Sequence, residues 1–144
     1  MEKEKDRYVI PIIFNEKNQL LLAKVKDEHL EFYHPLTYLF PGSAIREGET
    51  NEQALVRGTK DELGIDIRVI AQLNFVIHPL YIEEIYYYHC EMIDPNQPFK
   101  ESGVMLEKPF WVDFDKITDF MSTESSNPDV LKYIRMKING QLED

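Results

Sequence analysis

Short apolar runs separated by polar turns predict that the first part of this chain folds as strands. Tyr8–Phe14 is rich in β-branched and aromatic residues, and the apolar run Gln19–Val25 follows it after the polar turn Asn15–Asn18. Two such runs around a short turn are typical of a β-hairpin. Pro11 has no N–H to donate, so we expect it at a sheet edge or a bulge. A further strand, Tyr38–Phe40, runs into a Pro-Gly pair that stops it.

The pattern then changes from strand to helix over Thr50–Leu63. Thr50 precedes Gln53 at the spacing of a capping box, in which the two side chains satisfy free N–H groups of the first turn. Gly64 follows the last periodic residue, where a left-handed residue often ends a helix. The sequence therefore predicts both ends of this helix.

Beyond this helix the chain returns to strands and ends with a second helix. The predicted strands are Ile65–Val76, Ile82–Met92 and Pro109–Phe114, and the second helix begins at Asn127-Pro128, continues to about Ile138 and ends at Asn139-Gly140. This order of elements predicts an α+β fold, a mixed sheet with helices packed on it. We expect a single domain over residues 1–144, with a flexible N-terminus at 1–7.

The amino-acid composition and net charge limit the classes of molecule that this chain can bind. It has 144 residues, 43% of them hydrophobic, with 26 acidic and 16 basic side chains and a formal net charge of −10. Such a field repels phosphate backbones and anionic lipid, so we expect neither bulk nucleic acid nor a membrane as partner. A phosphate-bearing ligand would need a cation as intermediary. The polar start and the single Cys90, which has no internal disulfide partner, lead us to expect a cytoplasmic protein.

Candidate chemistry gathers around the first helix. Gly42 and Gly48 bracket a loop that turns before the helix N-terminus, a place that favours anions. At the other end, Arg57 lies one turn before Asp61, and Glu62 follows directly. Neighbouring carboxylates on a helix form a hard-oxygen site suited to magnesium or manganese. The alternative is that Asp61 and Glu62 form a solvated helix face, on which Arg57 and Asp61 form an ion pair.

The segment from 43 to 65 resembles the signature of the Nudix (MutT-like) hydrolases, Gly-x5-Glu-x7-Arg-Glu-U-x-Glu-Glu-x-Gly-U, where U is a bulky aliphatic residue. We call this segment the box. Asp61 stands at the first Glu of the Glu-Glu pair. The flanking segments 38–42 and 110–117 also resemble those of the family. Five residues match the signature directly: Glu49, Arg57, Glu62, Gly64 and Ile65.

The resemblance implies a Nudix-type α/β/α sandwich and a metal-dependent hydrolase of a nucleoside diphosphate linked to another group. Mg2+ (or Mn2+) would be held by Asp61 and Glu62, the implied catalytic residues, and would polarise phosphate oxygens for attack by water. Glu49 and Arg57 would pair and hold the loop on the helix. Arg46 and Gly42 would contact the substrate, because a guanidinium suits phosphate and glycine permits close approach. Arg46 is equally compatible with a solvated loop position.

Three departures from the signature leave a second interpretation open. Ser43 stands for the first Gly, Gly58 for the Glu after the motif Arg, and Thr59 for the aliphatic residue. The family's helix offers three carboxylates and this one offers two. In one interpretation, a carboxylate from outside the box replaces the missing glutamate. In the other, the chain is a non-catalytic nucleotide- or protein-binding module. The substrate and the oligomeric state, a homodimer among the options, are not indicated by the box. The candidate replacements are Glu83, Glu84 and Glu101.

Overall fold

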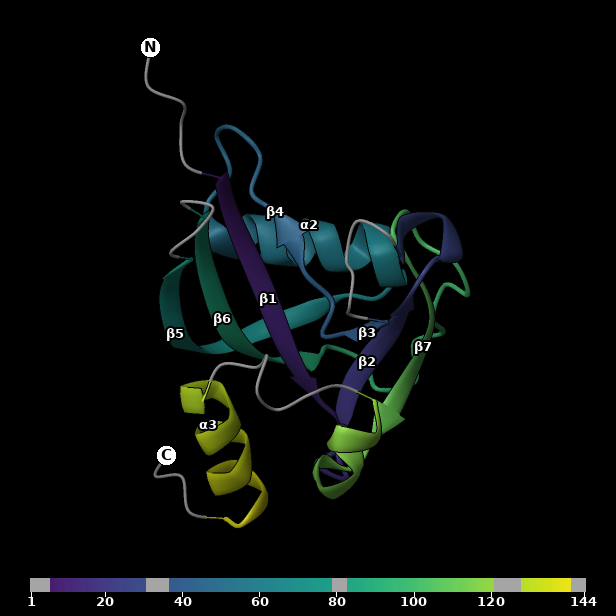
Figure 1. Cartoon of the computed structure of the whole chain (residues 1–144), viewed down its shortest axis with the longest axis vertical. Helices are drawn as coiled ribbons and strands as arrows, with labels where there is room; N and C mark the ends of the chain where they lie inside the picture. The colour runs from purple at the N-terminus through teal and green to yellow at the C-terminus, as the bar shows by residue number, and fades with distance from the viewer. Residues whose placement is uncertain (1–5, 31–36, 79–82, 121–127, 141–144) are drawn as a thin grey trace.

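Strand β1 (Asp6–Phe14) lies at the centre of the sheet in a computed structural model that describes residues 6–30, 37–78, 83–120 and 128–140 (Figure 1). Within these residues the strand order is β3-β2-β1-β6-β5, with β4 paired to β1 and β7 paired to β2. The pairing of β1 with β6 is parallel and the others are antiparallel, so the sheet is mixed as predicted. The predicted flexible N-terminus at 1–7 is wrong for residues 6 and 7, which begin β1. Residues 1–5 lie outside the described part.

The predicted hairpin is confirmed. Strand β2 (Leu20–Val25) pairs antiparallel with β1 at Phe14 and Leu20. The side chain of Asn15 accepts hydrogen bonds from two backbone N–H groups of the turn, at 2.9 Å each. Asn18 adopts a left-handed φ of 58°, which asparagine tolerates better than most residues.

Pro11 lies opposite Tyr88 of β6 in the central strand, and not at an edge or a bulge as the sequence suggested. On its other side, β1 pairs with β4 at Tyr8 and Val9 and with β2 at Phe14. Pro11 falls between these two pairings, where the ladder on that side is interrupted. A residue without an N–H is tolerated in such an interval.

The remaining strands are β3 (Tyr38–Leu39), β4 (Ser43–Ala44), β5 (Ile67–His78), β6 (Glu83–Met92) and β7 (Leu106–Val112). The sequence did not predict β4, because two residues are too short for a recognisable pattern. Strand β7 begins before the predicted Pro109, since Leu106 and Glu107 already pair with β2. It also ends earlier, because Phe114–Asp119 forms a 3-10 helix (η2). A second 3-10 turn, η1 (Asp27–His29), follows β2.

Both predicted helices are present. Helix α2 (Asn51–Leu63) has Thr50 as its N-cap with a complete capping box, and Gly64 ends it at φ 74°. Helix α3 (Pro128–Ile138) is followed by Gly140 at φ 69°, while the predicted cap Asn127 lies outside the described residues. Within the described residues, neither helix has the length and apolar character needed to cross a bilayer.

The two helices cover opposite faces of the sheet, which confirms the α/β/α sandwich (Figure 1). Alternate residues of a strand point to opposite faces. Val9 and Ile13 accordingly join the core beneath α2, whereas Ile12 and Phe14 join the core beneath α3. The α2 core also contains Ala54, Leu55 and Leu63, and the α3 core Val130 and Ile134.

Candidate functional site

The loop before α2 is fastened to the helix by the predicted pair of Glu49 and Arg57. Arg57 donates from Nε and Nη2 to the two carboxylate oxygens of Glu49, each at 2.9 Å. The same Nη2 donates to the carbonyl of Ala44 at 2.9 Å, and Glu49 also accepts from the backbone N–H of Arg46 at 2.8 Å. A bidentate guanidinium–carboxylate pair fixes orientation as well as distance. It therefore ties β4, the loop and the helix together.

The electrostatics of this pair agree with its geometry. The hydrogen bonds from Arg57, followed by that from the Arg46 N–H, lower the pKa of Glu49 to about 2. The same carboxylate raises the pKa of Arg57 above its ordinary value. Glu49 is therefore ionised at neutral pH and already has its positive partner.

Asp61 lies on the exposed side of α2, surrounded by positive groups. Its carboxylate is 3.7 Å from Nη1 of Arg57 and 3.9 Å from Nη2 of Arg46. Lys100 donates from Nζ to the main-chain carbonyl of Asp61 at 3.0 Å. The Asp61 side chain is 48% exposed and that of Arg46 is 67% exposed. The Asp61 carboxylate thus meets two guanidinium groups, and the Lys100 ammonium binds the main-chain carbonyl of the same residue, at a surface that solvent reaches.

Glu62 points elsewhere, although it is the next residue along the helix. It is 9% exposed, and its carboxylate accepts the backbone N–H groups of Val104, Met105 and Leu106 at 2.9, 2.9 and 3.3 Å. The expectation of one solvated face that carries both carboxylates is therefore wrong for Glu62. Asp61 faces the cations and Glu62 faces the segment before β7.

This arrangement bears directly on the magnesium site that the sequence suggested. Mg2+ requires several oxygen ligands in near-octahedral geometry. Glu62 is occupied by backbone donors, Asp61 is flanked by guanidinium groups, and Gly58 offers no side chain. Within the described residues, no group of three or more His, Cys, Asp or Glu side chains is placed to hold a metal ion. The residues as they lie do not fit the ion.

Gly58 itself is buried against Ser43 of β4. A Cβ built on Gly58 would overlap Oγ and Cβ of Ser43. The position that carries a glutamate in the signature is therefore filled here by the side chain of the facing strand.

The other predicted site residues lie apart from Asp61. Gly42 packs against β1, where a Cβ would come within 3.2 Å of Ile10 Cγ1. Glu84 accepts from the Tyr86 hydroxyl at 3.0 Å and lies 3.8 Å from Arg7 Nε. Arg7 in turn donates to Asn51 at the start of α2, so Glu84 is near the opposite end of the helix from Asp61.

Of the remaining candidate replacements, Glu101 is exposed and lies one residue beyond Lys100, and its carbonyl accepts the Lys108 N–H at 2.8 Å. The side chain of Glu83 lies outside the described residues. Neither Glu84 nor Glu101 joins a metal-binding group.

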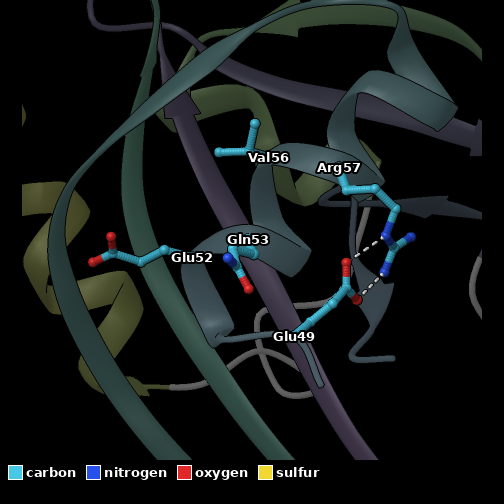
Figure 2. A pocket seen from close by; sticks show the side chains of 5 residues that line it. All are labelled: Glu49, Glu52, Gln53, Val56 and Arg57. Atoms are coloured by element: carbon cyan, nitrogen blue, oxygen red, sulfur yellow. Dashed lines mark hydrogen bonds and ion pairs between the residues drawn. The ribbon is translucent and has the colours of Figure 1, made fainter. Parts of the chain in front are cut away.

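The structure adds a pocket that the sequence did not indicate. It is a shallow depression of about 500 Å³ on the outer side of α2, and Figure 2 shows the Glu49–Arg57 pair among its lining side chains. Spacing along one helix could have suggested this surface, but not its concave shape. Its lining residues are Glu49, Glu52, Gln53, Val56 and Arg57.

The sequence also did not indicate Lys100 or the backbone N–H groups that donate to Glu62. They lie about forty residues beyond the box helix in the chain, in a segment without a motif. Only the tertiary structure brings them to the end of α2. Cys90 is fully buried in β6, as its apolar surroundings in the sequence suggested.

Comparison with known proteins identifies the family of this chain and a relative of part of it. The NUDIX domain family matches residues 4–133. An 8-oxo-dGTP diphosphatase from Proteus vulgaris is 31% identical over 78 residues, which are 54% of this chain and 67% of that protein.

Solved structures share the fold at low sequence identity. A NUDIX hydrolase from Nitrosomonas europaea superposes with a TM-score of 0.79 at 16% identity, over 98% of this chain and 76% of that one. An ADP-ribose pyrophosphatase from Streptococcus suis gives 0.71 at 14% identity, over 98% and 96% of the two chains. At these identities the structures establish the fold alone.

Proposed function

Because this chain belongs to the Nudix family, we propose that it binds a nucleoside diphosphate linked to another group, and that it does so without a metal ion on the box helix. The observation that supports this most is the crowding of Arg46, Arg57 and Lys100 around Asp61. A ligand phosphate needs positive charge in a chain of net charge −10. These side chains supply it where a metal ion would otherwise be required.

Arg46 is the group best placed to contact the phosphates. It is the most exposed of the arginines near the box, and its guanidinium presents paired donors that match phosphate oxygens. Arg57 is less available, because two of its donors are already bound to Glu49. Arg46 can leave the long contact to Asp61, at 3.9 Å, at little cost.

A metal-dependent hydrolase is the second candidate, with Mg2+ or Mn2+ held by Asp61 and Glu62. The intact Glu49–Arg57 pair favours it, since the resemblance to the family implies that this pair holds the loop on the helix. The relationship to an 8-oxo-dGTP diphosphatase also favours it. This candidate requires Glu62 to exchange its backbone donors for the ion. A homodimer and a cytoplasmic location stay predictions from the sequence.

Calorimetry with ADP-ribose, in chelator and in millimolar MgCl2, separates the candidates when product formation is followed in the same samples. The proposal predicts equal affinity in both buffers and no AMP. Arg46→Ala should weaken binding about tenfold, the loss of one charged contact. Arg68→Ala, which removes a similarly exposed arginine on β5, is the matched control and should bind normally. AMP formed only with metal would establish the hydrolase. No binding in either buffer would refute both the ligand class and the cation site.

A further inference from the structure

We infer that Glu62 is a positioning residue: its carboxylate anchors residues 104–106 through their backbone N–H groups, and this anchor places the Lys100 ammonium at the main-chain carbonyl of Asp61. The role assigns the last box carboxylate to holding a loop instead of a metal ion. The anchoring part stands whether or not a nucleotide binds. The contribution of Lys100 to phosphate binding rests on the proposed function.

Both carboxylate oxygens of Glu62 accept hydrogen bonds from the anchored segment. Oε2 of Glu62 accepts from Val104 at 2.9 Å and from Leu106 at 3.3 Å, and Oε1 accepts from Met105 at 2.9 Å. Three successive N–H groups aimed at one buried carboxylate form an anion-binding nest. An ionised acceptor makes each of these bonds stronger than a neutral one would.

Gly103 shows how closely the segment approaches Glu62. A Cβ on Gly103 would overlap the Glu62 carboxylate and its main-chain oxygen. The absence of a side chain at this position therefore permits the next three N–H groups to reach the carboxylate. Gly103 therefore allows the segment to pack directly against the end of α2.

The same segment carries Lys100 to Asp61. The backbone N–H of Lys100 donates to the carbonyl of Leu63 at 2.8 Å, and its Nζ donates to the carbonyl of Asp61 at 3.0 Å. Lys100 thus lies across the last turn of α2, and Glu62 fixes the segment a few residues further on. A cation supplied by the chain is therefore held at the main-chain carbonyl of Asp61.

Thermal melting with and without Mg2+ tests the anchor on the full chain. Native protein should melt at the same temperature in chelator and in MgCl2. Glu62→Gln should melt roughly 5–10 °C lower in both, because an amide accepts at one atom only and turns donors toward the backbone N–H groups. Asp61→Asn removes the neighbouring exposed carboxylate and should change the melting temperature little. If Mg2+ raises the native melting temperature and Glu62→Gln abolishes the rise, Glu62 is a metal ligand and the inference is wrong.

Hydrogen exchange gives a second readout that a loss of global stability does not mimic. In Glu62→Gln the amides of Lys100, Val104, Met105 and Leu106 should exchange much faster, while those of β1 keep their native order of protection. Gly103→Ala disturbs the same contact from the other partner and should give the same local pattern. If Glu62→Gln does not fold, Gly103→Ala takes its place in this experiment. A uniform increase over the whole sheet in both variants would refute a local anchor.

Binding of inorganic pyrophosphate in chelator tests the link to Lys100. Lys100→Met and Glu62→Gln should each lose about tenfold in affinity, and the double variant should lose no more than either, because Glu62 acts through Lys100. Full additivity, or native affinity in Glu62→Gln, would refute the positioning of Lys100 and leave the anchor intact. Native protein that binds no pyrophosphate would refute the phosphate site, whereas the melting and exchange results would still decide the anchor.

Discussion

Ser43 on β4 and Gly58 on α2 share one space, because the side chain of Ser43 fills the position that a side chain on Gly58 would need. The two departures from the Nudix signature that appear independent in the sequence are therefore one coupled change. In the signature the glycine is on the loop side and the glutamate is on the helix. Here the side chain has moved to the strand and the helix carries the glycine, which accounts for a helical glycine that the sequence left without a reason.

A double-mutant cycle should expose this coupling. Gly58→Ala alone forces an overlap with Ser43 and should destabilise the chain by about 1–3 kcal/mol. In a Ser43→Gly background the same change should stabilise it by about 1 kcal/mol, since alanine is the better helix former. Urea unfolding of the four proteins measures both effects. A similar effect of Gly58→Ala in the two backgrounds would contradict the shared space.

Restoring a metal site should require both positions. Gly58→Glu alone places its Cβ against Ser43, so the helix shifts and no ordered carboxylate is gained. With Ser43→Gly, the new carboxylate lies one turn before Asp61 at helical spacing. We expect MgCl2 to raise the melting temperature of the double variant and not that of either single variant. A rise with Gly58→Glu alone would show that Ser43 is not the obstacle.

Local signals account for what the sequence predicted well. The capping box at Thr50 and the left-handed Gly64 are short-range features, and both ends of α2 are correct. The pair of Glu49 and Arg57 followed from the family signature, whose spacing places them together. The mixed sheet with helices packed on it followed from the order of strands and helices, and the α/β/α sandwich followed from the resemblance to the family.

The parts that the sequence did not predict depend on contacts between distant residues. The donors to Glu62 come from residues 104–106, and nothing in the helix indicates them. Pro11 is acceptable in a central strand only because β1 changes partners beside it, from β4 to β2. Which strand pairs with each part of β1 depends on the packing of the whole sheet, and the local sequence does not indicate it.

The pair of Glu49 and Arg57 should contribute to stability in acid. The pKa of Glu49 is about 2 in the native state and 4.5 as an ordinary glutamate, so the unfolded state takes up the proton first. This contribution is complete above pH 4.5 and is lost as the pH falls toward 2. Glu49→Gln should therefore unfold with a weaker dependence on pH in this window. Glu52→Gln, an exposed neighbour, is the control and should follow the native curve.

Cys90 should be inert in the folded chain. Its side chain is fully buried, and burial raises the pKa of the thiol to about 12. Because the thiolate is the reactive species, a thiol reagent at neutral pH should modify Cys90 only after unfolding. Labelling followed through a urea transition should coincide with the loss of structure. Rapid labelling in native buffer would contradict the placement of Cys90.

His89 lies between the sheet and α3 as a buried neutral imidazole. Its Nδ1 is 2.7 Å from the hydroxyl of Tyr133, and its ring packs edge-on against Phe14 at 4.9 Å between ring centroids. Its Nε2 has no hydrogen-bond partner within the described residues and is 3.9 Å from a carboxylate oxygen of Glu91. Burial, with the nearby Lys137 ammonium, lowers the pKa of His89 to about 4.

Protonation of His89 should therefore loosen the attachment of α3. The unfolded histidine takes up a proton near pH 6.5 and the native one near 4, so stability is complete above 6.5 and declines as the pH falls between these values. The decline from this one group is at most about 1.4 kcal/mol per pH unit. His89→Phe keeps an aromatic ring and removes the titration, so its free energy of unfolding should fall less steeply over this range. Parallel curves for native and variant would show that His89 is already solvated, and that α3 does not depend on a neutral imidazole beneath it.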